Sequence, residues 1–225
     1  MTVLYEDNHL LVVNKTCREL VQGDKTGDEP LEESLKRWLK EKYAKPGNVF
    51  LGVTHRLDRP VSGAVVFAKT SKALSRMNEM FRNGQVRKTY WAIVKGVPAV
   101  SEATLEQYLV RNEQQNKSYV SQSAAPGAKK AILHYRLMAT SDRYSLLEVD
   151  LKTGRHHQIR CQLAAMGCPI KGDLKYGFPR SNPDGGISLH SRRVQFEHPV
   201  SHLPIDLTAP VPSDDALWAF FEQNA

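Results

Sequence analysis

The 225-residue sequence contains only three cysteines, Cys17, Cys161 and Cys168, and none belongs to a Cys-x-x-Cys pair. An odd number of cysteines without paired spacing argues against a disulfide framework and against a structural zinc site. Long apolar runs are also missing: no stretch approaches the roughly 18 residues of a membrane span, and the N-terminus lacks signal-peptide features. We therefore expect a cytoplasmic protein with reduced, mostly buried thiols and no contact with a membrane.

Several common catalytic signatures are absent as well. The sequence has no Gly-rich phosphate loop, no dinucleotide-binding fingerprint and no nucleophile elbow around a serine. The adjacent pair His156-His157 suggests a metal site, but on a helix the two side chains diverge, and no third ligand stands at a suitable spacing. We therefore expect no metal site.

Charge is distributed unevenly along a chain whose formal net charge is +7. Residues 55–95 contain nine Lys or Arg against two acidic residues, and residues 152–193 contain eight against two. Residues 194–225 contain five acidic residues and no Lys or Arg. If the fold brings the two basic segments together, they form the positive face expected for binding a nucleic-acid backbone. A surface that only keeps the protein soluble is the alternative.

Apolar periodicity predicts an α+β protein. Strands are expected at residues 9–15, 64–68, 86–96, 131–138 and 144–151, helices at residues 31–39 and 70–82, and a further helix opening within residues 152–160. Residues 112–128 are polar, and we expect a mobile loop there. No linker or repeat is evident, so we treat residues 1–225 as a single domain. The absence of a large amphipathic surplus favours a monomer.

One turn, residues 55–63 (HRLDRPVSG), places a carboxylate at a loop-to-strand junction. Pro60 disfavours helix at the preceding residue, and Gly63 releases the chain into the strand. Arg56 and Arg59 flank Asp58 and favour its ionised form. A rigid junction of this kind can present a nucleophile to a cleft. By itself, however, an aspartate in a turn more often accepts hydrogen bonds from its own backbone.

The start of the helix after residue 152 is also basic. Gly154 and Arg155 at a helix start suit a phosphate oxygen. Arg160 follows Arg155 by five residues, about 140° around a helix, so the two side chains serve different groups. We expect one of them to pair with a buried carboxylate and the other to contact a nucleic-acid backbone.

Five blocks, taken in order, resemble the RluA-like family of RNA pseudouridine synthases. They are HRLD at 55–58 with Ser62-Gly63; RKTY at 87–90; TGR at 153–155 with HQIR at 157–160; Pro169 with Gly172-Asp173 and Tyr176-Gly177; and Leu189-His190 with His198-Pro199. The resemblance covers nearly the whole chain. It implies a pseudouridine synthase fold, with a mixed, mostly antiparallel central sheet flanked by helices and a catalytic cleft across the sheet.

By position, the resemblance implies that Asp58 is the catalytic aspartate, that Tyr90 stacks on the target base, and that Arg160 is the basic partner of the aspartate. Leu189 would line the base pocket. The implied reaction breaks the C–N glycosidic bond of a uridine in tRNA or rRNA, turns the base and rejoins it through carbon, with no cofactor. Asp58 can attack either C1′ of the ribose or C6 of the uracil. The phenol of Tyr90 is a candidate for helping to remove the C5 proton. Flipping the uridine out of the RNA would be assisted by Arg56 and the basic helix at 70–82.

Three features depart from the family pattern. Residues 14–18 read NKTCR where the family has Asn-Lys-Pro and a glycine, and Val61 replaces a usual threonine. The chain also begins at the catalytic body, so we expect no small N-terminal RNA-binding domain. Two other functions stay open: a non-catalytic RNA-binding or assembly protein, and a glycosidase using Asp58 alone. Glycosidases commonly use two carboxylates, and the sequence indicates no second acidic partner near this site.

Overall fold

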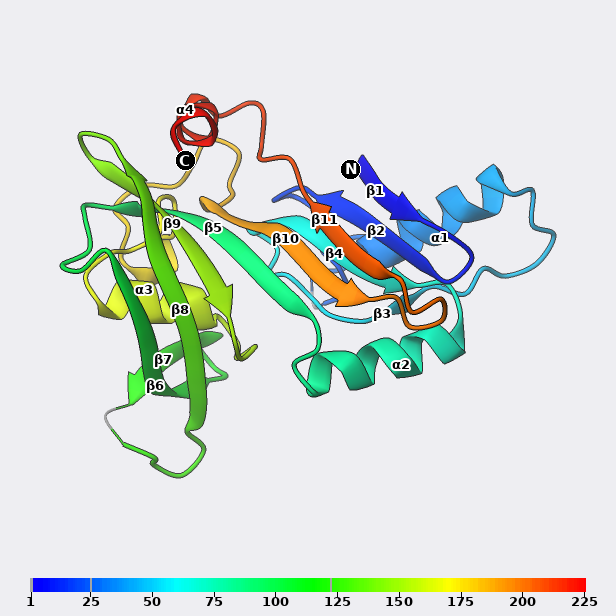
Figure 1. The fold of residues 1–225 in the computed structure, drawn as a ribbon, viewed down its shortest axis with the longest axis horizontal. Coiled ribbons are helices and arrows are strands. Elements are labelled where there is room, and N and C mark those ends of the chain that lie inside the picture. The colour runs from blue at the N-terminus through cyan, green and yellow to red at the C-terminus, as the bar shows by residue number, and fades with distance from the viewer. Residues whose placement is uncertain (1, 25, 122) are drawn as a thin grey trace.

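Strands dominate the computed structural model, which describes residues 2–24, 26–121 and 123–225. The strands are β1 (Thr2–Glu6), β2 (Leu10–Lys15), β3 (Gly52–Val53), β4 (Ser62–Ala68), β5 (Arg87–Lys95), β6 (Glu102–Asn112), β7 (Lys117–Ser121), β8 (Lys129–Thr140), β9 (Tyr144–Leu151), β10 (Leu189–Glu197) and β11 (Pro204–Thr208). The helices are α1 (Leu31–Lys42), α2 (Ser71–Arg82), α3 (Gln158–Ala165), the 3₁₀ turn η1 (Leu174–Tyr176) and α4 (Ala216–Asn224). Figure 1 shows their arrangement.

Within the described residues, all these strands belong to one sheet with the order β1-β2-β4-β10-β5-β9-β8-β6-β7. β11 extends it beside β10, and β3 lies beside β4. Among the strands that the structure describes, only β4 and β10 pair in parallel, through His190 opposite Ser62 and Ser191 opposite Gly63. The predicted mixed, mostly antiparallel sheet is therefore confirmed, and its one parallel contact is two residues long.

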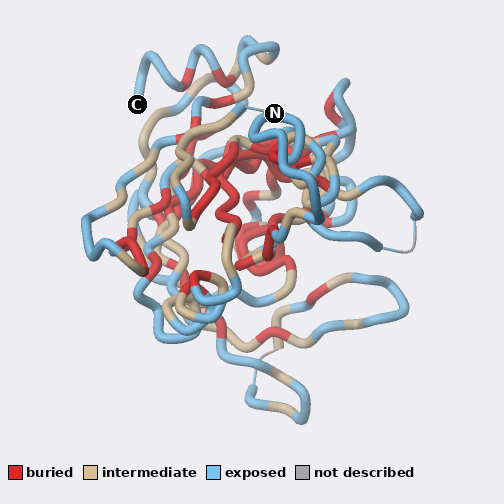
Figure 2. Tube along the Cα trace, turned by 90° about the vertical axis from the view of Figure 1, so that its right-hand side faces the viewer, coloured by how far each residue is buried: buried red, intermediate tan, exposed pale blue. Residues whose placement is uncertain are grey.

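The alternation of apolar residues along the strands sends side chains into cores on both faces of the sheet. In β5, Tyr90, Ala92 and Val94 enter one core while Trp91 and Ile93 enter another, as their spacing predicts. α1 and α3 pack on the first face, and α2 and α4 pack on the opposite one. Figure 2 shows buried segments concentrated in the central strands and exposed ones at the periphery.

The helices follow local signals. The hydroxyl of Thr70 accepts a hydrogen bond from the N–H of Ala73 and caps α2, which begins at Ser71. The buried stripe of α1, formed by Leu31, Leu35 and Leu39, extends over the predicted span, and the helix runs three residues further. None of the helices in the described parts of the chain has the length and apolar character that a membrane crossing requires.

Residues 112–128 differ from the mobile loop that their composition predicts. They contain β7, which pairs with β6 and packs against α3. Ser118 explains the order of this strand, since its N–H donates to the hydroxyl of Tyr176 at 2.9 Å and its carbonyl accepts from the thiol of Cys161. The polar side chains thus form tertiary contacts that composition alone does not reveal.

Candidate active site

β4 pairs with β10 at Ser62 and Gly63, and further along β4 the loop of residues 54–61 lies beside the strand, where Thr54 and His55 hydrogen-bond to the backbone of Val66. Gly63 makes the close approach possible, because a Cβ at this residue would lie 2.4 Å from the carbonyl oxygen of Ser191. Its φ of +113° also suits glycine alone. The junction that the sequence predicts is therefore set by strand contact, and Asp58 lies in the loop just before it.

Lys15, at the end of β2, holds this loop through hydrogen bonds to its backbone. Its ammonium is buried and donates to the carbonyl oxygens of Arg59 at 2.9 Å and Val61 at 2.6 Å. Burial is the main reason that the pKa of Lys15 is lowered to about 8. The lysine was not among the predicted site residues, although it stands within the NKTCR segment at the end of an apolar strand.

Asp58 is held through one of its two oxygens. Nη1 of Arg160 donates to Oδ2 at 3.0 Å, and Nε2 of His157 lies 3.5 Å from the same atom. Oδ1 has no hydrogen-bond partner among the described residues, and the side chain is 33% exposed. The pairing of Asp58 with Arg160, 102 residues later, is the one that the family resemblance implies.

Arg160 also binds a second carboxylate, that of Asp173, in a bidentate ion pair. Nε and Nη2 donate to the two oxygens at 2.7 and 2.9 Å, and the Asp173 side chain is 1% exposed. Burial would lower the pKa of Arg160, but the hydrogen bonds that it donates to Asp173 and the charges of both carboxylates outweigh burial and raise that pKa. The predicted buried carboxylate is thus found, and an acidic residue does lie near the site, contrary to expectation.

A chain of hydrogen bonds determines which nitrogen of His157 carries its proton. The hydroxyl of Tyr176 accepts from the N–H of Ser118 and lies 3.0 Å from Nδ1 of His157. The phenol therefore donates to Nδ1, and the neutral ring carries its proton on Nε2, facing Asp58. Burial lowers the pKa of His157 to about 3, so the ring is neutral at physiological pH.

The two adjacent histidines do not diverge as predicted. The rings of His156 and His157 stack 3.8 Å apart with an interplanar angle of 22°. The reason is that His157 precedes α3 in a left-handed conformation with φ of 52°, so helical spacing does not apply. This residue delays the helix, which begins at Gln158. Among the described residues, no group of three or more His, Cys, Asp or Glu side chains is arranged to hold a metal ion.

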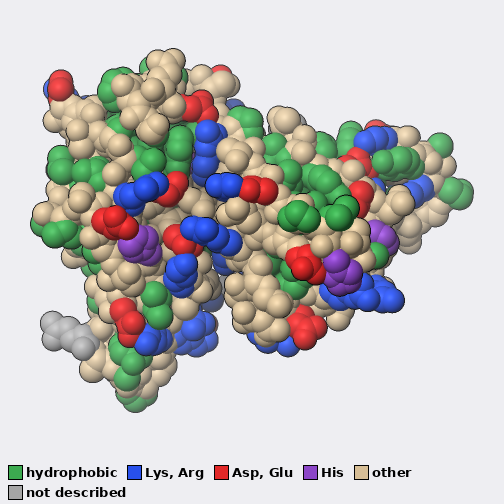
Figure 3. Space-filling view, viewed as in Figure 1, with side chains coloured by type: hydrophobic (Ala, Val, Ile, Leu, Met, Phe, Trp, Pro, Cys, Tyr) green, Lys and Arg blue, Asp and Glu red, His purple; other side chains and the backbone are tan. Residues whose placement is uncertain are grey.

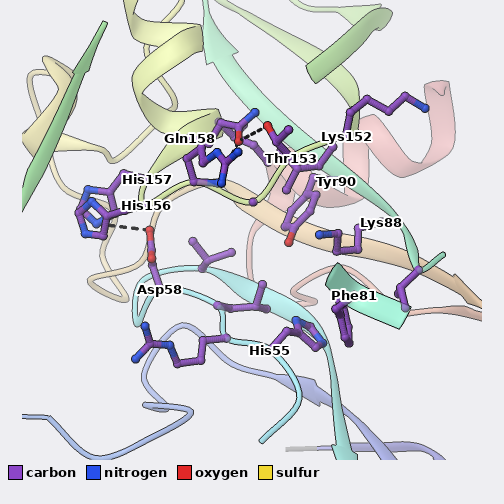
Figure 4. A pocket seen from close by; sticks show the side chains of 18 of the residues that line it. His55, Asp58, Phe81, Lys88, Tyr90, Lys152, Thr153, His156, His157 and Gln158 are labelled. Atoms are coloured by element: carbon purple, nitrogen blue, oxygen red, sulfur yellow. Dashed lines mark hydrogen bonds and ion pairs between the residues drawn. The ribbon is translucent and has the colours of Figure 1, made fainter. Parts of the chain in front are cut away.

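The cleft wall opposite Asp58 is aromatic and apolar. Tyr90 and Leu189 come from the neighbouring strands β5 and β10, are both buried, and line the same cleft of about 860 Å³ as Asp58. Burial raises the pKa of Tyr90, so its phenol stays protonated. Figure 4 shows Tyr90 across the cleft from Asp58, with Thr153 and Gln158 above it.

The predicted RNA-contacting arginines lie at the rim. Arg56 and Arg155 are exposed and line the cleft, and Nε of Arg155 donates to the carbonyl of Lys130 at 2.8 Å. Arg59 does not serve Asp58 as predicted, because its guanidinium pairs with Asp28.

Both basic segments of the sequence contribute to this cleft. Residues 55–95 supply four of its basic residues (Arg56, Arg82, Arg87 and Lys88), and residues 152–193 supply three (Lys152, Arg155 and Arg160). Figure 3 shows Lys and Arg side chains on both sides of the notch between the two parts of the molecule. The expected basic face is therefore concave.

Three residues at or beside the cleft were not predicted as functional: Asp173, His157 and Tyr176. Asp173 and Tyr176 belong to one of the five blocks that resemble the family, and His157 belongs to another. Membership of these blocks is the sequence feature that could have identified the three residues as functional.

Comparison with known proteins gives a consistent picture. Residues 9–165 match the family model described as RNA pseudouridylate synthase. The chain is 32% identical over 217 residues to the uncharacterized RNA pseudouridine synthase YhcT of Bacillus subtilis, covering 95% of this chain and 70% of that protein. It is 33% identical over 228 residues to the ribosomal large subunit pseudouridine synthase D of Xylella fastidiosa, covering 95% and 67%.

The fold also matches a solved structure, that of human RNA pseudouridylate synthase domain containing 4. The TM-score is 0.81 with 24% sequence identity, covering 99% of this chain and 93% of that chain. This likeness confirms the predicted fold.

Proposed function

Because the chain belongs to the RNA pseudouridylate synthase family, whose members are isomerases acting on RNA, we propose that Asp58 is the nucleophile that converts specific uridines to pseudouridine. One observation carries the assignment. Arg160 holds Oδ2 of Asp58 by a hydrogen bond, and Oδ1 has no partner among the described residues in a side chain that lines the cleft. A carboxylate held on one side and free on the other is arranged to attack.

Two routes fit this geometry. If Oδ1 attacks C1′, the C1′–N1 bond breaks with its electron pair on uracil; the base then turns, and its C5 displaces Asp58 from C1′. If Oδ1 attacks C6, the C1′–N1 bond of the adduct breaks with its electron pair on the base, the base turns, and C5 bonds to C1′; the bond between Asp58 and C6 breaks afterwards. In both routes the C5 proton is lost to a base at the end. The protonated phenol of Tyr90 provides a stacking face and a hydrogen-bond donor. In that state it is not the base.

The rim positions suit RNA. Arg56 and Arg155 are exposed cations at the mouth of the cleft, where the backbone of a flipped nucleotide enters. Leu189 supplies an apolar wall for the base. The relative from Xylella fastidiosa is named for the large ribosomal subunit, which supports rRNA as the first RNA to test before tRNA. We propose that residues 1–225 act as one catalytic domain and as a monomer.

The glycosidase alternative needs a second free carboxylate. Asp173 is close, but Arg160 occupies both of its oxygens. Asp150 lines the cleft, but Lys152 and Arg87 pair with it at 2.6 and 3.5 Å. Neither is available as a general acid, which favours isomerisation over hydrolysis.

Tritium release tests the proposal against both alternatives. RNA carrying 5-tritiated uridine releases tritium only when carbon 5 exchanges its hydrogen for a bond to ribose. Isomerisation therefore releases tritium, whereas RNA binding and simple base removal do not. Absence of release from both total tRNA and total rRNA would contradict the proposed function. Mapping pseudouridines in cellular RNA with and without the protein then identifies the uridine.

A further inference from the structure

The mechanism leaves one half-buried cation of the cleft unused, Lys88. It lies on β5 two residues before Tyr90, so the two side chains extend from the same face of the strand into the cleft. Figure 4 shows its ammonium between Tyr90 and the pair formed by Phe81 and His55, on the far side of Tyr90 from Asp58. Lys88 is therefore at the catalytic cleft without touching the nucleophile.

Lys88 is the half-buried lysine of the cleft, and it has no counter-charge in the described part of the chain. Arg160 has two carboxylates, and Arg87 and Lys152 share Asp150. Nζ of Lys88 has no carboxylate within 4.0 Å and no hydrogen-bond acceptor among the described residues. Burial lowers the pKa of this lysine, and no opposing contribution offsets it.

The groups around the ammonium cannot supply an anion. The ring of Phe81 lies 5.7 Å away and offers only a cation–π contact. His55 is neutral, since burial and then the charge of Lys88 lower its pKa to about 3. On the other side the backbone passes at Gly154, where a Cβ would lie 3.9 Å from Nζ. A half-buried ammonium without a counter-charge is only partly hydrated, so an anionic ligand in the cleft would stabilise it.

We infer that Lys88 is a specific binding site for one phosphodiester group of the RNA, next to the nucleotide whose base lies against Tyr90. The inference rests on the proposed function, because it takes a nucleotide to be the occupant of the cleft. The phosphate is the anion that every RNA nucleotide carries, and a compact ammonium suits it as a point charge. The group lies on either the 5′ or the 3′ side of the target nucleotide, and the experiment distinguishes these.

The test compares three small probes on the full chain: uridine, uridine 5′-(methyl phosphate) and uridine 3′-(methyl phosphate). Each diester carries one negative charge and no base-specific difference from uridine. Dissociation constants come from NMR titration. We expect one diester to bind about tenfold more tightly than uridine, as a charged hydrogen bond contributes. Lys88→Met, which keeps the length of the side chain, should abolish this preference, and Lys88→Arg should retain it.

Lys95 provides the matched control. It is an exposed lysine at the opposite end of β5 and does not line the cleft, so Lys95→Met should leave the preference unchanged. Raising the pH should weaken the preference in the wild type as Lys88 loses its proton, but not in Lys88→Arg, whose charge persists. Thermal unfolding shows whether each variant is folded.

Three results would overturn the inference: equal binding of all three probes by the wild type, equal weakening of all three in Lys88→Met, or loss of the preference in Lys95→Met. Equal weakening would mean that the ammonium contacts the base or the ribose. Tritium release reports on the proposed function separately. Release without phosphate preference refutes the site alone, whereas a Lys88-dependent preference without release supports the site and contradicts the proposed function.

Discussion

The turn at residues 54–61 and the turn at residues 170–176 each present an aspartate to the same arginine, but they hold it differently. Asp173 is 1% exposed and uses both oxygens on Arg160. Asp58 is 33% exposed and uses one. A fully engaged carboxylate anchors the guanidinium, whereas a half-engaged one keeps an oxygen for chemistry. Both residues are aspartates, and in the proposed function the number of occupied oxygens distinguishes the anchoring role of Asp173 from the reactive role of Asp58.

Asp58→Asn is expected to have the largest effect on activity. The amide preserves the shape but is not a nucleophile, so tritium release should fall by at least about 10⁴-fold. RNA binding, measured by filter retention, should survive because the cations of the cleft are unchanged. Asp206→Asn, at an exposed pair with Arg193, is the control and should keep full activity. Normal turnover in Asp58→Asn would remove the distinction between the two aspartates.

Arg160→Ala breaks both pairs at once and should lower activity by about 10³-fold. It leaves Asp58 without its cation and leaves Asp173 buried without a partner, so stability should also fall. Arg160→Lys retains the charge but lacks the planar fork, and we expect it to restore stability only in part. Unchanged kinetics in Arg160→Ala would show that another base holds the nucleophile.

Asp173→Asn tests whether Asp173 only anchors Arg160 or also takes part in the reaction. We expect a loss of about 3–5 kcal/mol in the free energy of unfolding, measured with denaturant, because a buried ion pair loses one partner. Activity should fall by roughly 10²-fold, as Arg160 is no longer oriented toward Asp58. If stability is unchanged while activity is lost, Asp173 takes part in the chemistry and the comparison between the turns is wrong.

Tyr176→Phe tests whether the hydroxyl of Tyr176 sets the tautomer of His157, the neutral ring beside Asp58. The change removes the donor to Nδ1 of His157, so activity should fall about fivefold, and side-chain ¹⁵N NMR should show a mixed tautomer. The pKa of His157 is about 3 against its ordinary 6.5, so its neutral form contributes stability above pH 6.5 that is lost as the pH falls toward 3. This slope, at most about 1.4 kcal/mol per pH unit, should shrink in the variant. Identical slopes would contradict the assigned hydrogen-bond chain.

Arg59→Ala should have the smallest effect, less than about twofold on tritium release. Its guanidinium pairs with Asp28 at the surface, and such pairs contribute little. A large loss of activity would mean that Arg59 turns toward Asp58 when RNA binds.

Periodic patterns predicted the sheet and its helices well, because the faces of β5 and the cap of α2 depend on residues close in sequence. The resemblance to a family predicted the trio of Asp58, Tyr90 and Arg160, and the structure brings these three residues to one cleft. Their roles in the reaction stay predictions.

The remaining site features depend on contacts that no local pattern reveals. The left-handed conformation of His157 is unfavourable for a residue with a side chain, and it is held by packing against Tyr176 and Asp58. The direction of Arg59 depends on Asp28, 31 residues earlier. β7 depends on the contacts of Ser118 with Tyr176 and Cys161. Each of these three features depends on tertiary contacts and is therefore visible only in the folded structure.

The distance along the chain between Asp58 and Arg160 has a consequence for how the protein matures. Closing a loop of 102 residues is entropically slow, and contacts of such high sequence separation form late in folding. During synthesis, Asp58 emerges long before Arg160 and its anchor Asp173. If Asp58 is the nucleophile that we propose, the nascent chain is expected to be inert toward the RNA around it until the second half of the sheet has assembled.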